Sequence, residues 1–215
     1  MSAYFNEKQL RWAGNQARLW WSALQHNGEQ EQKKAFYSLG RADRARCARC
    51  ASLQELEYER APLLLLESLT QGYDGSNADF FAWLKKDSMA LLLIAGVLVH
   101  VRTDSSEEKS LMQSLGFAAV KKDERPKLSE LRFRRLLAED SYEDFFHAMR
   151  RTVKLSDSEG VNVSRLAIDL LEWTRQHANA ERNSVKFRWA QDYYLSGKDR
   201  LSVEESRETE TEKEN

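Results

Sequence analysis

The scarcity of chain-breaking residues is the strongest constraint on how this sequence folds. Only two prolines and nine glycines occur among 215 residues, so long stretches contain no position that interrupts a helix. No stretch alternates apolar and polar residues between hairpin turns, which is the pattern typical of strands. Between residues 4 and 25, apolar side chains instead recur at spacings of three and four, which builds one apolar face on a helix. The sequence therefore predicts an all-α protein.

A charged segment in the middle of the chain predicts its domain organisation. Residues 121–127 read KKDERPK, contain one of the two prolines and have no apolar residue. We interpret them as a short charged linker between two helical bundles. The N-terminal helical bundle spans residues 1–120 and the C-terminal helical bundle spans residues 128–200.

An acidic segment follows the second predicted bundle. Residues 203–215 read VEESRETETEKEN and hold six Glu against one Arg and one Lys, a net charge of −4. Such a composition has too few apolar residues to fold, so we expect a disordered acidic tail over residues 201–215. Without residues 203–215 the chain has 31 basic and 28 acidic residues, so the predicted body is only mildly basic, with a net charge of +3.

Local signals predict where several helices begin and end. An arginine-rich helix is expected over residues 41–57, and a long helix is expected from a cap at Asp79 to about Val101. Pro62 suits the first turn of the next helix after residue 57. Two further pairs have the spacing of N-terminal caps, namely Ser105 with Glu108 and Ser141 with Asp144.

The most apolar run is too short to cross a bilayer. Residues 89–101 read MALLLIAGVLVHV and number 13, whereas a membrane span needs about 20. We interpret this run as a buried central helix and expect no membrane association. Glu7 and Lys8 interrupt the first apolar residues, so no secretory signal is apparent, and the two cysteines then favour a cytoplasmic protein.

The sequence contains no recognisable catalytic constellation, cofactor motif or metal motif. The four histidines are scattered, and neither a glycine-rich phosphate loop nor a nucleophile elbow occurs. Cys47 and Cys50 have the C-x-x-C spacing, but the chain lacks the second ligand pair that structural zinc requires. We expect both cysteines to pack on the inner face of a helix. A metal- or thiol-dependent enzyme that uses them is a third and weaker hypothesis.

Arginines surround the two cysteines and give the first candidate binding surface. Between Gly40 and Gln54 only Asp43 is acidic, whereas a solvated helix usually mixes Glu with Lys. Four clustered guanidinium groups repel one another unless an anion compensates them, and alanines between them would let a nucleic-acid backbone approach. Two interpretations stay open, phosphate binding and a basic face that pairs with acids elsewhere. The candidate residues are Arg41, Arg44, Arg46 and Arg49.

The second half of the chain repeats this basic character. In RFRRLL, Phe133, Leu136 and Leu137 are expected to point inward while the arginines project outward. Trp189, Tyr193 and Tyr194 recur at helical spacing and are expected to be mainly core residues. Basic clusters without a base-reading motif suggest contact with a nucleic-acid backbone. The candidates here are Arg132, Arg134, Arg135, Arg150 and Arg151, with Lys154 beside them, and Lys186 and Arg188.

The ordered set of these segments resembles the CasB family, the small subunit of the type I-E CRISPR surveillance complex Cascade. The resemblance covers most of residues 12–195 and is carried by GRADRARCARCASL, SLGFAA, RFRRLLAEDS, FFHAMRRTVKL, VNVSRLAIDLLEW and VKFRWAQDYY. It implies an all-helical protein with two bundles and no catalytic activity. Some family members place an arginine after SLG, where this chain has Phe117, so a contact at that position is not expected here.

The resemblance also implies partners and a role in antiviral defence. The expected partners are the backbone and large subunits of Cascade, the guide RNA and the target DNA, with self-association inside the complex. The basic surface would hold the displaced non-target strand and stabilise the R-loop without reading its bases. The alternative hypothesis is a helical adaptor whose basic faces dock acidic protein partners.

Overall fold

The protein is all-helical, as the sequence predicts. The computed structural model describes residues 7–25, 36, 38–71, 88–120, 124–158, 160–178 and 184–195. Within these ranges there is no strand, and one isolated bridge joins Asp104 to Val161. None of the helices in these ranges is both long enough and apolar enough to cross a membrane.

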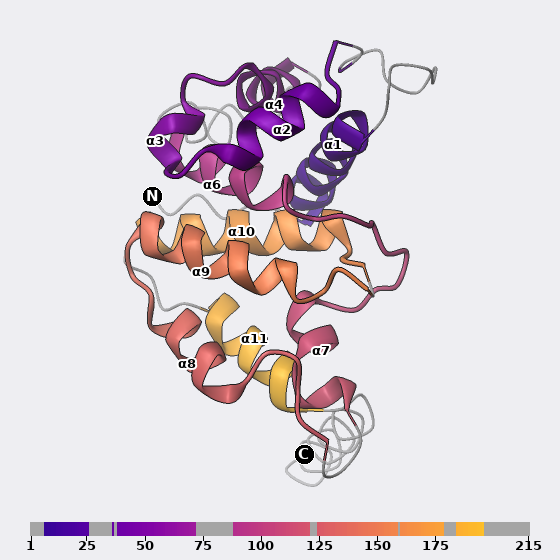
Figure 1. Ribbon diagram of the computed structural model, residues 1–215, viewed down its shortest axis with the longest axis vertical. Helices are drawn as coiled ribbons and strands as arrows, with labels where there is room; N and C mark the ends of the chain where they lie inside the picture. Colours follow the sequence, from indigo (N-terminus) through magenta and orange to yellow (C-terminus); the bar gives the residue numbers. More distant parts are fainter. Residues whose placement is uncertain are drawn as a thin grey trace, which may run out of the picture.

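The helices form two groups around a pair that crosses the middle of the molecule (Figure 1). The first group lies at one end and contains α1, α2, α3, α4 and α6; α9 and α10 run side by side next to it, and α7, α8 and α11 lie beyond. The elements are α1 Glu7–Gln25, α2 Arg41–Arg49, α3 Leu53–Leu56, α4 Arg60–Gln71, α6 Ser88–Leu98, α7 Leu111–Leu115, the 3₁₀ turn η2 Phe117–Ala119, α8 Glu130–Ala138, α9 Tyr142–Lys154, α10 Val163–Ala178 and α11 Ser184–Tyr194.

Helix α6 is the buried centre of the first group. Every residue from Ala90 to Leu98 is buried, because the helix is apolar on all sides and no face of it tolerates water. It packs against α3, α4, α9 and α10, so it contacts elements from both halves of the chain. The expectation of a buried central helix is confirmed for these residues, while the proposed cap at Asp79 lies outside the described ranges.

Helix α1 approaches α10 closely through a glycine. A Cβ atom at Gly14 would lie 2.8 Å from the Ser164 carbonyl oxygen and 3.0 Å from the Ile168 side chain. Only glycine allows the two backbones to come this near without displacing one of them. Since α1 and α10 lie on opposite sides of the predicted linker, their packing joins the two halves of the sequence.

One continuous apolar cluster includes buried residues from both predicted bundles. Helix α7 precedes the predicted linker, yet it packs on α11 near the end of the described chain. Leu128, which follows the linker, donates its backbone N–H to the Leu115 carbonyl over 3.0 Å. The division into two bundles stays a prediction, and these contacts cross it. Residues 121–123 and 196–215 lie outside the described ranges.

Stacked aromatic rings hold α8, α9, α10 and α11 together. The Phe145 and Trp173 rings lie 3.8 Å apart at 4°, and the Phe133 and Tyr193 rings lie 4.0 Å apart at 6°. Such contacts add about 1 kcal/mol each to the burial of the rings themselves. Trp189 and Tyr193 are buried while Tyr194 is 40% exposed, so the expectation that these aromatics form mainly core is confirmed.

The arginine-rich helix is shorter than the sequence suggests. It ends at Arg49 rather than continuing to residue 57, and α3 begins separately at Leu53. The Ser52 hydroxyl accepts a hydrogen bond from the Glu55 N–H, which caps α3 and lets the chain change direction between the two helices.

Of the two predicted caps, one is confirmed and one is wrong. Ser141 caps α9 by accepting a hydrogen bond from the Asp144 N–H at 3.0 Å. The proposed box of Ser105 with Glu108 starts no helix, because the Ser105 N–H donates to the Val161 carbonyl and this stretch is not helical. The capping box lies five residues later, at Ser110 and Gln113. Pro62 lies in the first turn of α4, as predicted.

Gly96 gives a test of the contact between α6 and α9. A Cβ atom there would lie 2.6 Å from Leu56 Cδ1 and 2.7 Å from Phe146 Cε2. Gly96→Ala should therefore lower the free energy of unfolding by about 1–3 kcal/mol, although alanine is the better helix former. Urea denaturation measures this change.

The double variant Gly96→Ala with Phe146→Leu is the control for that prediction. Leucine removes the ring atom that the new methyl group meets, so the double variant should lose less stability than the sum of the two single variants. Simple additivity would show that the ring is not what excludes a side chain at residue 96.

Candidate nucleic-acid interface

Arg44 is partly buried, and its guanidinium bonds to neighbouring elements of the protein. Its guanidinium donates to the Val99 carbonyl at 3.0 Å, to the Val101 carbonyl at 3.0 Å and to Gln25 Oε1 at 2.7 Å. Burial and the charge of Arg102 lower the pKa of Arg44 from its usual value. These contacts connect α2 to the ends of α1 and α6, so Arg44 sets the position of α2.

Arg46 is also occupied by internal partners. It pairs with Asp43 in its own helix and with Glu59 at 3.1 Å in the stretch before α4. Asp43 is buried, accepts the Gly40 N–H at 3.0 Å to cap α2, and pairs with Arg60 as well. Asp43, the one acidic residue between Gly40 and Gln54, is therefore already paired with arginines of the protein.

Arg150 attaches α9 to the C-terminal end of α2. It donates to the Cys50 carbonyl at 3.0 Å, and its guanidinium lies 4.9 Å from the centre of the Phe146 ring. The carbonyl at a helix end has no partner within the helix, so an arginine that reaches it replaces water. Arg150 thus fixes the angle between the arginine-rich helix and α9.

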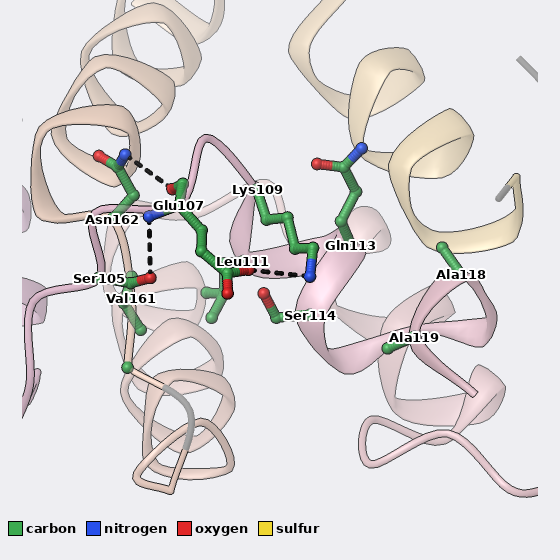
Figure 2. A pocket seen from close by; sticks show the side chains of 11 residues that line it. Ser105, Glu107, Lys109, Leu111, Gln113, Ser114, Ala118, Ala119, Val161 and Asn162 are labelled. Atoms are coloured by element: carbon green, nitrogen blue, oxygen red, sulfur yellow. Dashed lines mark hydrogen bonds and ion pairs between the residues drawn. The ribbon is translucent and has the colours of Figure 1, made fainter. Parts of the chain in front are cut away.

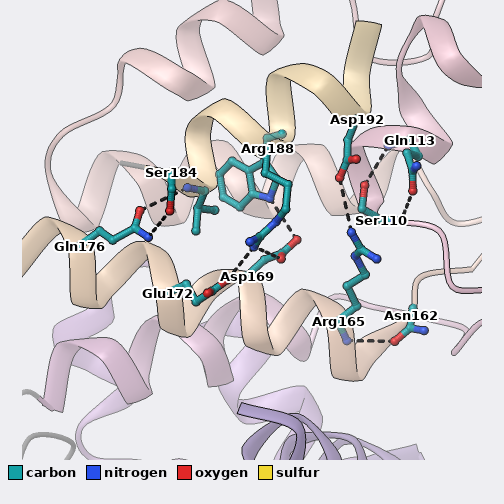
Figure 3. Close-up of polar contacts among 12 residues, drawn as sticks. Ser110, Gln113, Asn162, Arg165, Asp169, Glu172, Gln176, Ser184, Arg188 and Asp192 are labelled. Carbon is teal, nitrogen blue, oxygen red and sulfur yellow. Dashed lines mark hydrogen bonds and ion pairs between the residues drawn. The ribbon is translucent and has the colours of Figure 1, made fainter. Parts of the chain in front are cut away.

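Two cations connect α11 to its neighbours, Arg188, which Figure 3 shows, and Lys186. Arg188 pairs with Asp169 at 2.7 Å and with Glu172 at 2.6 Å, and the Trp189 indole N–H donates to Asp169 at 3.0 Å. Lys186 donates to the Glu139 carbonyl at the end of α8 over 3.2 Å. Both cations stabilise the packing of α11 against α8 and α10.

The remaining candidates are exposed. Arg134 pairs with Glu130 at 2.6 Å within α8. Arg41 donates to the Gln25 carbonyl at 3.2 Å. Among the described residues, neither a carboxylate nor a hydrogen-bond acceptor lies within reach of the other exposed candidates, Arg49, Arg132, Arg135 and Arg151.

One cleft lies where α2 meets the ends of α6 and α9, and we call it the α2–α6 cleft. It has a volume of about 380 Å³ and is lined by Arg41, Arg44, Ala45, Ala48, Val99, His100, Arg102 and Lys154. None of these lining residues is a carboxylate, although Arg102 reaches Asp157 at 3.2 Å. Helix α2 contributes Arg41, Arg44, Ala45 and Ala48 to this lining.

A second cleft lies between α8 and α9, and we call it the α8–α9 cleft. It has a volume of about 560 Å³ and is lined by Leu128, Arg132, Arg135, Leu136, Glu139, Ala148, Arg151, Thr152, Lys154 and Leu155. Four of these side chains are cations and one is an acid. The leucines at 128 and 136 are buried, whereas the four cations are exposed, so the cleft has an apolar floor and a basic rim.

Lys154 lines both clefts, so together they form one basic track around the C-terminal end of α9. Of the residues singled out from the sequence, the track includes Arg41, Arg44, Arg132, Arg135 and Arg151. Sequence reasoning missed Arg102, which directly follows the apolar run, and did not assign His100, which lies within that run, to a binding surface. Lys154 follows Arg151 by three residues on α9 and belongs to the same basic cluster in the sequence. In the structure it lies where the two clefts meet.

A third cavity, lined mainly by residues 105–119 and 160–162, has a different character (Figure 2). It has a volume of about 470 Å³, and its charged side chains Glu107 and Lys109 pair with each other at 2.8 Å. Because its charges neutralise one another, it has no preference for an anion. Within the described residues, no group of three or more His, Cys, Asp or Glu side chains is placed to hold a metal ion.

The two cysteines are packing residues on the inner face of α2 and its end. Both are unpaired and buried. Burial, with smaller contributions from Glu59 and Cys50, raises the pKa of the Cys47 thiol to about 12. A thiol that stays protonated at neutral pH is a poor nucleophile and a poor metal ligand, so these cysteines lack the properties that the enzyme hypothesis requires.

A family comparison identifies the group to which the chain belongs. The model of the CRISPR-associated protein Cse2 family matches residues 43–194. This chain belongs to the Cse2 family. Cse2 is the CasB small subunit of type I-E Cascade, so the resemblance seen in the sequence is confirmed and the chain is a structural subunit of a multisubunit CRISPR complex. No curated protein and no solved structure matched the chain.

The Cse2 match covers almost the whole basic track. Every lining residue of the α8–α9 cleft falls inside residues 43–194, and of the α2–α6 cleft only Arg41 falls outside.

His100 predicts a pH dependence of stability. Burial and the charges of Arg150, Lys154 and Arg44 lower the pKa of His100 to about 4. The unfolded chain therefore binds a proton between about pH 6.5 and 4 that the folded protein does not, and stability falls as the pH falls through this window. With allowance for partial exposure of the ring, this loss amounts to about 1 kcal/mol between pH 7 and pH 5.

His100→Gln should remove that part of the loss, which urea denaturation at the two pH values measures. If wild-type protein and the His100→Gln variant lose equal stability between pH 7 and pH 5, the ring is not held neutral by its surroundings.

The cysteines predict slow thiol chemistry. In the native protein at neutral pH, neither Cys47 nor Cys50 should react with a thiol reagent within minutes, because both are buried and burial raises both pKa values. In denaturant both should react at once, which the release of the chromophore from a disulfide reagent measures. A native thiol that reacts as fast as free cysteine would contradict the packing role.

Proposed function

We propose that this chain is a non-catalytic subunit of type I-E Cascade that binds the backbone of the displaced non-target DNA strand and stabilises the R-loop. The observation that carries this proposal is the basic track, in which two clefts share Lys154 and contain a single carboxylate among their lining residues, Glu139. A track of this kind fits a polyanion better than it fits a small ligand.

The physics of R-loop formation favours such a contact. The guide–target duplex is about as stable as the DNA duplex it replaces, so protein contacts with the displaced strand are enough to shift the balance. Cations that contact phosphate supply this energy by releasing counterions, without any requirement on the base sequence. The described residues that line the two clefts include no Phe, Tyr or Trp, which argues against base stacking there.

Two roles are proposed for the candidate cations, according to their exposure and their contacts within the protein. Exposed cations on or beside the track are proposed to bind phosphate directly, and these are Arg41, Arg49, Arg102, Arg132, Arg134, Arg135, Arg151 and Lys154. Other cations are engaged inside the protein and are proposed to hold the track in shape. They are Arg44, Arg46, Arg150, Lys186 and Arg188.

The remaining expectations about partners belong to the same proposal. The subunit would act beside the backbone and large subunits of Cascade and the guide RNA, would associate with a second copy of itself, and would work in the cytoplasm in antiviral defence. Support for these comes from membership of the Cse2 family.

Charge reversal tests the proposal. Arg135→Glu with Arg151→Glu should weaken binding of fluorescent single-stranded DNA by the full chain about tenfold or more, because two phosphate contacts are lost. The slope of log affinity against log salt should fall by about 1.4, at about 0.7 for each contact with a single strand. Fluorescence anisotropy between about 50 and 200 mM salt measures both, since phosphate contacts change the affinity strongly over this range.

Lys8→Glu with Arg11→Glu is the matched control, since it changes the net charge equally on α1, away from either cleft. This control should alter the affinity only slightly. If the two double variants weaken binding equally, overall charge rather than the track governs the interaction, and the adaptor hypothesis with an acidic protein partner takes its place.

A further inference from the structure

The α8–α9 cleft has a feature that phosphate binding alone does not use. Its floor contains the buried side chains of Leu128, Leu136 and Ala148, beneath the exposed cations of its rim. A phosphate backbone pairs with the rim but leaves uncovered the partly exposed Leu155, which lies beside these buried side chains. The surface therefore suits a segment in which apolar and acidic side chains follow one another.

The chain contains one such segment a short distance along the sequence from α11. Residues 201–205 read LSVEE, in which Leu201 and Val203 are followed by two glutamates, and four more glutamates lie between residues 208 and 214. Alternate residues of an extended segment point to the same side, so Leu201 and Val203 would face the floor together. The acidic residues that follow would then meet the rim.

The end of α11 lies beside the cleft. The Tyr193 hydroxyl donates to the Leu128 carbonyl at 2.7 Å, and Leu128 lines the cleft. The Tyr194 hydroxyl reaches Glu130, in the first turn of α8, at 3.1 Å. From Leu195 to Leu201 an extended chain spans about 20 Å, whereas Arg135 lies only about 8 Å along α8 from Glu130.

We propose that residues 201–205 of this chain dock in the α8–α9 cleft and compete there with nucleic acid. Leu201 and Val203 cover the apolar floor, and Glu204 and Glu205 pair with the cations of the rim. The segment thereby occupies the basic track when no strand is bound, and a higher concentration of DNA is needed to displace it. The competition rests on the proposed function, whereas the docking itself does not.

Crosslinking with a zero-length carbodiimide tests the docking in the full chain without DNA. This reagent joins a carboxylate to an amine only when the two are in contact, and Lys154 is the lysine of the cleft. Mass spectrometry should find Glu204 or Glu205 joined to Lys154, and not to Lys8 on α1. Crosslinks that are absent from Lys154, or equally frequent at Lys8, would overturn the proposal.

The variant Leu201→Asp distinguishes docking by apolar contact with the floor of the cleft from docking by electrostatic attraction alone. This variant adds a negative charge, so docking by charge alone would strengthen and the crosslink to Lys154 would increase. If Leu201 covers the floor, the crosslink should instead fall severalfold. An increase would show that the floor plays no part and would overturn the proposed mode of docking.

DNA binding tests the competition with a charge-matched pair of variants. Glu204→Gln with Glu205→Gln should tighten binding of single-stranded DNA about threefold to tenfold at low salt. Glu212→Gln with Glu214→Gln changes the net charge by the same amount at a distance from the docked residues and should have a smaller effect. Equal effects of the two variants would overturn the competition.

The two proposals fail in distinguishable ways. If no variant binds DNA while the Lys154 crosslink persists, the proposed function fails and the docking stands. If wild-type protein binds DNA but added DNA leaves the crosslink unchanged, the function stands and the competition fails. A crosslink that forms only between two copies, seen as a covalent dimer, would overturn docking within one chain.

Discussion

The rest of the structure depends on the need to keep water away from every side of α6. A helix that is apolar all round cannot lie at a surface, so α3, α4, α9 and α10 must enclose it. This enclosure brings α2 and α9 together at the point where α6 ends. The carbonyls of Val99 and Val101 then need donors, and Arg44 supplies them. The α2–α6 cleft therefore lies where the buried helix α6 ends.

The five candidate cations that are engaged inside the protein divide into two sets by the groups to which they donate. Arg44, Arg150 and Lys186 donate to carbonyls at or just beyond the ends of helices, where an acceptor has no partner within the helix. Arg46 and Arg188 pair with carboxylates between elements. These contacts stabilise the packing of the helices whose exposed cations line the two clefts. Phosphate binding, as proposed here, therefore depends on arginines that touch no phosphate.

The sequence predicts much of the fold, because periodicity within one helix decides which side chains are buried. In RFRRLL, Phe133 and Leu136 are buried and the arginines are exposed, as expected from a spacing of three. The cap at Ser141 follows equally from local residues. The structure departs from expectation where contacts are distant in sequence. Arg44 lies on the outer arc of a helical wheel, yet α6 ends beneath it, and no pattern within residues 41–49 contains that information.

The track could be predicted only in part for the same reason. The basic clusters were visible separately, but their union at Lys154 requires the packing of α2, α6 and α9. His100 and Arg102 are isolated in the sequence and gain significance only through their neighbours in space.

The sharing of Lys154 has a consequence for how a strand would occupy the surface. The single ammonium group of Lys154 cannot neutralise one phosphate in each cleft at the same time, so the two clefts would not be independent binding sites. Two short oligonucleotides would interfere with each other across Lys154, whereas a single longer strand gains the second cleft as an intramolecular step. The protein would therefore bind one unbroken single strand more tightly than it binds fragments of the same total length.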